Sequence, residues 1–237
     1  MPTAGRAGFR GWERLAIRDD SGRERQAVAP VIVSASRSTD IPAFYGDWFV
    51  RRLSLGHAAW VNPWNGRASY VSFAKTRAIV FWSKDPRPFL GYIPEVEKMG
   101  YSFSFLYTLN DYRNENLEPN LPTLAARERT FIDLSSRLGP SGVSWRFDPL
   151  LLSDSLSVED LLSRIGSIGS RLHRYTRRLI VSFVDIARYA KVRHSLAAAG
   201  HPDVREFSPP EVDEFCAGLS DLASGWGLRV YACGEKE

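Results

Sequence analysis

The feature that most constrains the fold of this chain is a short apolar run that occurs six times, each time ending in polar or charged residues before a candidate helix. The runs are Val31–Ser34, Ala78–Trp82, Ser102–Tyr107, Val143–Phe147, Leu179–Phe183 and Leu228–Ala232. Strands that alternate with helices are typical of α/β folds with a parallel sheet. Six units are fewer than the eight of a closed barrel, so we predict a partial (β/α)6 TIM-like barrel. In such folds, ligands bind where the carboxyl ends of the strands meet.

Two β-hairpins are predicted in addition to these units. Residues 1–30 combine a disordered start with two alternating segments around a turn, which indicates an N-terminal hairpin. Residues 58–73 alternate on both sides of Asn65-Gly66, a strong turn signal, so a second hairpin is inserted after the first β/α unit. We assign residues 31–237 to a single barrel domain.

Candidate helices lie between the apolar runs. They are residues 41–56, 86–98, 121–138, 158–173, 186–199 and 209–224. Glycines follow several of these segments, as expected where a helix ends.

Composition limits the class of protein. A chain of 237 residues with 44% hydrophobic residues can bury a core, and no stretch approaches the ~20 apolar residues of a membrane span. We expect a cytoplasmic protein without membrane contact. The two cysteines, Cys216 and Cys233, are too few for a disulfide scaffold, and four scattered histidines predict no metal site.

A group of arginines is the sharpest basic feature. Arg171, Arg174 and Arg178 fall near one face of a candidate helix, where they could contact phosphates. Basic residues in the last turn of a helix also complement its dipole, and we favour that interpretation. The net charge of +4 permits nucleic-acid binding without making it the first choice.

Strand alternation selects the candidate site. In residues 143–148, large apolar side chains alternate with Ser144, Arg146 and Asp148, so these three are expected to face the barrel interior. Residues 102–108 repeat the pattern, with Ser102, Ser104 and Thr108 on the interior face. The predicted ligand-binding residues are Ser36, Arg37, Asn62, Lys84, Thr108 and Arg146, and the candidate catalytic carboxylates are Asp40, Asp148 and Asp185.

Each charged candidate also has a structural alternative. Three carboxylates could cap a following helix, and these are Asp40, Asp85 and Asp148. Arg146 could pair with Asp148, and Lys84 with Asp85, instead of with a ligand. For Glu118 we favour a role in a turn or in solvent over ligand binding.

Five segments carry a family resemblance when taken together and in order. They are residues 32–42, 62–65, 80–86, 117–122 and 145–149. With them, residues 30 to 237 resemble a bacterial family catalogued as domain of unknown function 1848. The resemblance implies a partial β/α barrel related to radical S-adenosylmethionine proteins, with a cysteine cluster near the C-terminus that holds an iron–sulfur centre.

The cysteines of this chain depart from that family pattern. A cluster of this kind needs three protein thiolates, and Cys233 alone cannot supply them. We therefore expect no complete cluster here, so S-adenosylmethionine and the iron–sulfur centre are expected only for the full-length family. Either the reading frame is truncated or this member has lost the metal chemistry.

Three functions remain open at this point. The first is a barrel protein of radical S-adenosylmethionine ancestry with a small-molecule pocket at the strand ends. The second is a metal-independent enzyme that uses Asp40, Asp148 and Asp185 for acid–base chemistry on a ligand anchored by Arg146. The third is a nucleic-acid-binding module that uses the arginines and exposed aromatic residues such as Trp64. The sequence does not specify substrate, reaction or oligomeric state.

Overall fold

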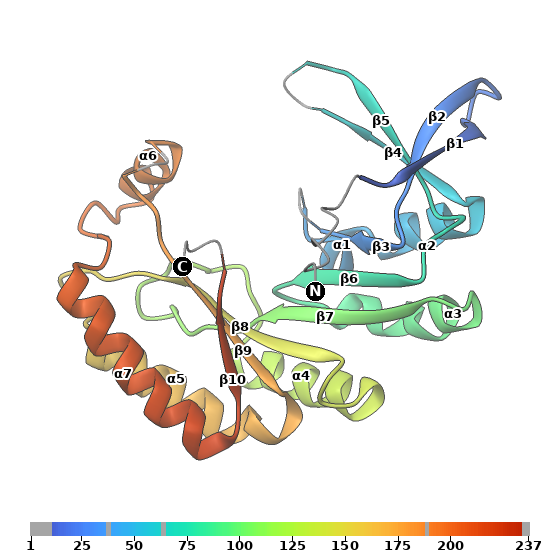
Figure 1. Cartoon of the computed structure of the whole chain (residues 1–237). Coiled ribbons are helices and arrows are strands. Elements are labelled where there is room, and N and C mark those ends of the chain that lie inside the picture. Colours follow the sequence, from blue (N-terminus) through green and yellow to red (C-terminus); the bar gives the residue numbers. More distant parts are fainter. Residues whose placement is uncertain (1–10, 37–38, 63–64, 188–189, 234–237) are drawn as a thin grey trace, which may run out of the picture.

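The computed structural model describes residues 11–36, 39–62, 65–187 and 190–233, which form two sheets and their helices (Figure 1). The larger sheet has six strands, all parallel. They are β3 (Ile32–Ser34), β6 (Ala78–Ser83), β7 (Ser102–Thr108), β8 (Val143–Leu150), β9 (Arg178–Phe183) and β10 (Arg229–Ala232). Their order in the sheet is their order in the chain, with β3 and β10 at the edges. All six predicted strands are confirmed.

Helices follow the strands, as the alternation predicts. They are α1 (Ile41–Phe44), α2 (Gly46–Leu55), α3 (Ile93–Lys98), α4 (Leu124–Leu138), α5 (Val158–Leu172), α6 (Ala190–Ala198) and α7 (Pro209–Trp226), with short 3-10 helices at Arg87–Tyr92 and His173–Tyr175. Helices α3, α4, α5 and α7 lie on one side of the larger sheet (Figure 1). The α/β class is therefore confirmed. In the described part of the chain, none of these helices has the length and apolar character of a membrane span.

The side of the sheet that faces the helices is strongly aromatic. Tyr107 on β7 and Trp145 on β8 are neighbours in register and fully buried. Tyr107 stacks on Phe131 of α4 at 5.5 Å, and Trp145 lies 6.5 Å from Trp226 of α7. These contacts confirm the predicted alternation, so residues of opposite parity on β7 and β8 face away from the helices.

The first predicted helix is divided in two. Residues 41–56 form α1 and α2, separated by Tyr45, whose ψ of 31° departs from helical geometry. A Cβ atom at Gly46 would lie 2.8 Å from the ring of Tyr92, so the glycine allows the following 3-10 helix to approach closely. The break between α1 and α2 thus lies next to a close contact that the local helical pattern does not reveal.

The alternative in which Asp148 caps a helix is ruled out. Asp148 and Pro149 lie within β8, whose last residue pairs with Phe183 of β9. The next helix, α5, begins at Val158 and is capped by Ser157, whose hydroxyl accepts from the Asp160 N–H. Sheet pairing extends the strand past the position where the Asp-Pro pair suggests a helix start.

The smaller sheet contains both predicted hairpins. Its strands are β1 (Glu13–Arg18), β2 (Glu24–Ala29), β4 (His57–Val61) and β5 (Ala68–Ser72), in the order β1-β2-β5-β4. The sequence predicts each hairpin but not their junction, where Ala27 pairs with Tyr70 and Val28 with Val71 in parallel. Pairing between distant strands leaves no local pattern in a sequence.

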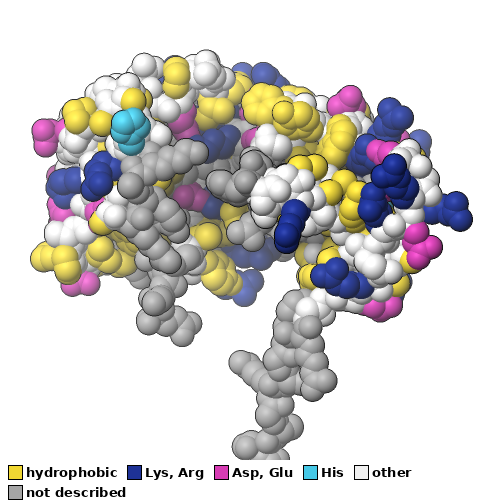
Figure 2. Space-filling view, turned by 90° about the horizontal axis from the view of Figure 1, so that it is seen from above, with side chains coloured by type: hydrophobic (Ala, Val, Ile, Leu, Met, Phe, Trp, Pro, Cys, Tyr) yellow, Lys and Arg dark blue, Asp and Glu magenta, His cyan; other side chains and the backbone are white. Residues whose placement is uncertain are grey.

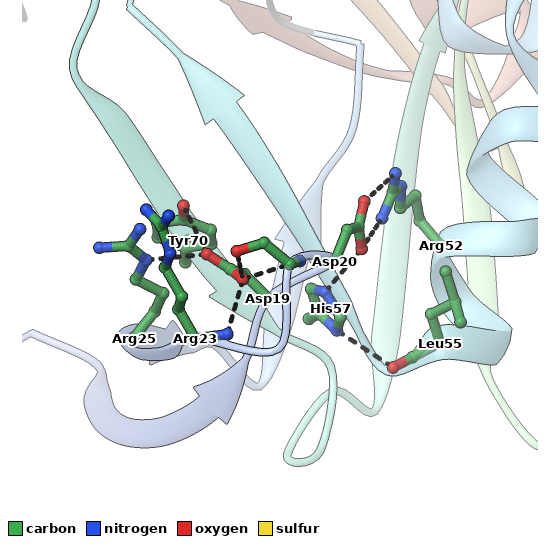
Figure 3. A network of polar contacts seen from close by, with 9 residues as sticks. Asp19, Asp20, Arg23, Arg25, Arg52, Leu55, His57 and Tyr70 are labelled. Carbon is green, nitrogen blue, oxygen red and sulfur yellow. Dashed lines mark hydrogen bonds and ion pairs between the residues drawn. The ribbon is translucent and has the colours of Figure 1, made fainter.

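Two carboxylates attach the β1–β2 turn to its surroundings (Figure 3). The Asp19 carboxylate accepts hydrogen bonds from the Ser21 and Arg23 backbone N–H groups and from Arg25 Nε at 2.8 Å. Asp20 pairs with Arg52 of α2 at 2.7 Å. The first contacts close the turn and the second joins the smaller sheet to the helical part.

Acid is expected to loosen this attachment. The hydrogen bond from Arg52 lowers the pKa of Asp20 below its ordinary value of 3.8. A lowered folded pKa means that the contact stabilises the fold above pH 3.8 and that the stabilisation is lost as pH falls through the folded value. NMR shifts of β1–β2 amides should show this step in an acid titration. The step should disappear in Asp20→Asn, whose amide does not titrate; an unchanged step in that variant would assign it to other groups.

Candidate functional site

A buried arginine marks the carboxyl ends of the central strands. Arg146 on β8 is 7% exposed, and its side chain forms an ion pair with Asp148. Its Nη1 donates to the Thr108 hydroxyl at 3.4 Å, and its guanidinium lies 4.5 Å from the ring centroid of Trp82 on β6. The structure thus brings together three predicted site residues. Trp82 was missed, although strand alternation places it opposite the helix-facing Phe81.

The environment of Arg146 disfavours its charge. Burial lowers the pKa of Arg146, against the opposite effect of the neighbouring Cys233 thiol, which follows β10. Its Nε has no hydrogen-bond partner among the residues that the structure describes. The ion pair with Asp148, the Thr108 hydroxyl and the ring of Trp82 together offset the burial of this cation.

Lys84, directly after β6, and Glu118 form a second pair. The alternative in which Lys84 pairs with Asp85 is not formed, because Lys84 Nζ pairs with Glu118 Oε1 while Asp85 contacts Arg87 at 3.4 Å. Glu118 has the expected turn role through its backbone, since its carbonyl accepts from the Leu121 N–H at 3.3 Å, but its side chain is only 14% exposed and does not serve solvent. The partner of Lys84 therefore comes from the segment that follows the neighbouring strand β7 and not from the next residue in the sequence.

Asp40 connects α1 to the end of β6. Its Oδ1 accepts from the Ala43 N–H at 3.0 Å, which confirms the predicted cap. Its Oδ2 accepts from the Ser83 hydroxyl at 3.0 Å and from the Lys84 N–H at 2.8 Å. Burial raises the pKa of Asp40 against these hydrogen bonds. The carboxylate therefore holds α1 against the strand that carries Lys84.

An apolar cavity of about 660 Å³ lies next to α1, at the carboxyl end of β3. Its walls are Val33, Ser34, Ala35, Ser36, Thr39, Ile41, Tyr45, Trp48, Phe49, Ala58, Ala59, Trp60, Val61, Val71 and Phe73. Tyr45, Trp60 and Val61 are exposed, and Figure 2 shows hydrophobic side chains gathered over the part of the molecule that carries β4 and β5. The Ser36 hydroxyl accepts from the Ile41 N–H at 3.3 Å, which ties the end of β3 to α1. We name this space the β3 cavity.

The other predicted residues are spread over the strand ends. Ser36 lies three strand spacings, or about 14 Å across the sheet, from Arg146. Asn62 belongs to the β4–β5 turn, where its backbone exchanges hydrogen bonds with Arg67 and Gly66 at 2.9 Å. Asp185 follows β9, on the far side of β8 from Lys84. Arg37 lies outside the described residues.

Comparison with known proteins identifies a family for this chain. The model of the domain of unknown function DUF1848 matches residues 32–237, which include every strand of the larger sheet. The chain belongs to this family. No curated protein and no solved structure matches it.

The cysteines of this DUF1848 chain do not fit a three-thiolate cluster. Cys216 is exposed on α7, whereas Cys233 follows β10 beside Arg146, and both are free thiols. Over the described ranges, no group of three or more His, Cys, Asp or Glu side chains could hold a metal ion. We therefore derive no chemical step through an iron–sulfur centre.

The predicted arginine group of this DUF1848 chain makes contacts within the protein. Arg171, in the last turn of α5, pairs with Glu128 of α4 at 2.6 Å. Arg178 Nη2 donates to the Ser141 carbonyl at 3.1 Å. These contacts give two of the arginines structural roles. Trp64, the proposed stacking residue, lies outside the described residues.

Proposed function

We propose that this DUF1848 chain is a partial β/α barrel that binds a small organic molecule with an apolar body in the β3 cavity. The chain-ordered strands of the open parallel sheet support the barrel interpretation. In such an arrangement, the β3 cavity lies at the end of the sheet where ligands bind.

The β3 cavity is the observation that carries this proposal. Its volume of about 660 Å³ falls in the range of small-molecule sites, and its walls are mostly apolar. Ser34, Ser36 and Thr39 add hydroxyl groups on the β3–α1 side, where they can orient a polar group of the ligand. Asp40, with its raised pKa, lies directly behind this wall. An apolar pocket with a few convergent polar groups and a perturbed carboxyl is typical of a binding site.

We assign the carboxylates to positioning rather than to acid–base catalysis. Asp40 accepts three hydrogen bonds from Ala43, Ser83 and Lys84, and Asp148 is paired with Arg146. A general base needs a lone pair that faces the substrate. These contacts support a role in which Asp40 fixes the wall of the cavity.

Binding of 2-naphthoate, an aromatic carboxylate, tests the β3 cavity. Trp48→Ala should weaken its binding at least tenfold in calorimetry, because the variant removes an aromatic wall worth about 1.5 kcal/mol or more. Trp12→Ala is the matched control, since Trp12 lies outside the cavity and is 39% exposed, against 38% for Trp48. Equal affinities in the two variants, or no binding by the unmodified chain, would overturn the proposal.

A further inference from the structure

A second, smaller cavity lies between the end of β7 and the start of α4. Its volume is about 250 Å³, and its walls include Arg113, Glu118, Thr123 and Arg127. A water molecule occupies about 30 Å³ of liquid, so there is room for several waters or for one compact organic molecule. None of the walls of the β3 cavity takes part. We name this space the α4 cavity.

Arg127 places an unsatisfied cation in the wall of the α4 cavity. The residue is 5% exposed, and its Nη2 donates to the Asn110 carbonyl at 2.9 Å. Its Nε and Nη1 are buried and have no hydrogen-bond partner among the described residues. Buried N–H groups without acceptors are rare in native proteins, because each costs about 1–3 kcal/mol. An anion in the cavity would supply the missing acceptor.

The electrostatic surroundings favour an anion near Arg127. Arg113 is exposed at the same cavity and adds a second positive charge. Thr123, which lines it, is the N-cap of the 15-residue helix α4, whose dipole is positive at that end. Three positive features thus line the same cavity.

Glu118 places a hydrogen-bond acceptor without a donor in the wall of the same cavity. Its Oε1 pairs with Lys84, but its Oε2 is buried without a hydrogen-bond partner in the described part of the chain. Glu118 Oε2 and the free Arg127 nitrogens therefore do not bond to each other, although both residues line one cavity. A ligand that satisfies both must offer an acceptor to Arg127, where the positive surroundings favour an anionic group, and a hydrogen-bond donor to Glu118.

We propose that the α4 cavity binds a small carboxylate with an adjacent N–H or O–H donor, such as an α-amino or α-hydroxy acid. The carboxylate accepts from Arg127, and the donor is bound by Glu118 Oε2. This site is separate from the β3 cavity, and neither proposal depends on the other.

Calorimetry with four probes tests the ligand class. L-Alanine and L-lactate carry the carboxylate with an ammonium or a hydroxyl donor, propionate lacks the donor, and inorganic phosphate tests a simple anion site. We expect alanine or lactate to bind at least tenfold more tightly than propionate, which leaves Glu118 unpaired. Preference for phosphate would overturn the carboxylate assignment, and no binding by any of the four probes would overturn the proposal.

Two substitutions test whether Arg127 and Glu118 bind the ligand. Arg127→Met should reduce binding of the preferred probe at least tenfold, whereas Arg129→Met, an exposed position on the same helix, should not. Glu118→Gln should weaken alanine more than lactate, because the amide oxygen still accepts a hydroxyl proton but no longer carries charge. Unchanged binding in both site variants would overturn the proposal. Glu118→Gln keeps the test valid if Arg127→Met fails to fold, and the loss of 2-naphthoate binding in Trp48→Ala reports the β3 cavity separately.

Discussion

Replacing Asp148 by alanine is expected to lower the free energy of unfolding by about 3 kcal/mol. The substitution leaves the Arg146 guanidinium buried without its carboxylate partner. Removing one partner of a buried ion pair typically costs about 3–5 kcal/mol. We expect the lower end of that range, because the Asp148 side chain is 20% exposed and water can reach the site. Urea unfolding followed by circular dichroism measures the change.

Two further variants separate the charge from the fold. The double variant Arg146→Met with Asp148→Leu removes both charges and should lie within about 1 kcal/mol of the unmodified chain. Asp154→Ala, at an exposed position a few residues later, should change stability by less than about 0.5 kcal/mol. A loss below about 1 kcal/mol in Asp148→Ala would contradict the description of Arg146 as a buried, carboxylate-dependent cation.

Two glycines of α5 are expected to respond in opposite directions to alanine. A Cβ atom at Gly169 would lie 2.2 Å from the ring of Trp226, which also stacks on His173 and packs near Trp145. Gly169→Ala must displace this indole and should cost about 2 kcal/mol of unfolding free energy.

Gly166 is the matched control on the same helix. Its added Cβ would meet only Leu222, at an ordinary distance of 3.8 Å. Gly166→Ala should therefore stabilise the chain by about 0.5–1 kcal/mol through helix propensity alone. Thermal and urea unfolding of both variants measure the difference. Equal stabilisation by the two substitutions would contradict the close approach of α5 to Trp226.

Local patterns account for the parts of the fold that could be predicted from the sequence. The six strands are short apolar runs, and both hairpins alternate around turn residues such as Asn65-Gly66, so each signal lies within a few neighbouring residues. The β2–β5 junction joins residues more than forty positions apart and leaves no such signal. At Asp148-Pro149 a local signal is present but misleading. It suggests the start of a helix, whereas pairing with β9 keeps these residues in a strand.

For the same reason, only part of the candidate site could be predicted from the sequence. Alternation along β8 correctly placed Arg146 and Asp148 on one face, and their contact follows from the strand. Glu118 is different, since only the folded chain brings it to Lys84, which is 34 positions away. The unpaired nitrogens of Arg127 could not be foreseen either, because an unsatisfied group is defined by all of its neighbours at once.

The β2–β5 junction also bears on which N-terminal residues the folded protein needs. The segment shared with the family starts at residue 32, after β1 and β2. Yet β2 supports the edge of β5, and the β4–β5 hairpin supplies one side of the β3 cavity. A chain trimmed to the shared segment would leave one edge of β5 with unpaired backbone N–H and C=O groups. Strands of other chains could pair with such an edge. The β1–β2 hairpin, which precedes the shared segment, therefore supports one wall of the β3 cavity.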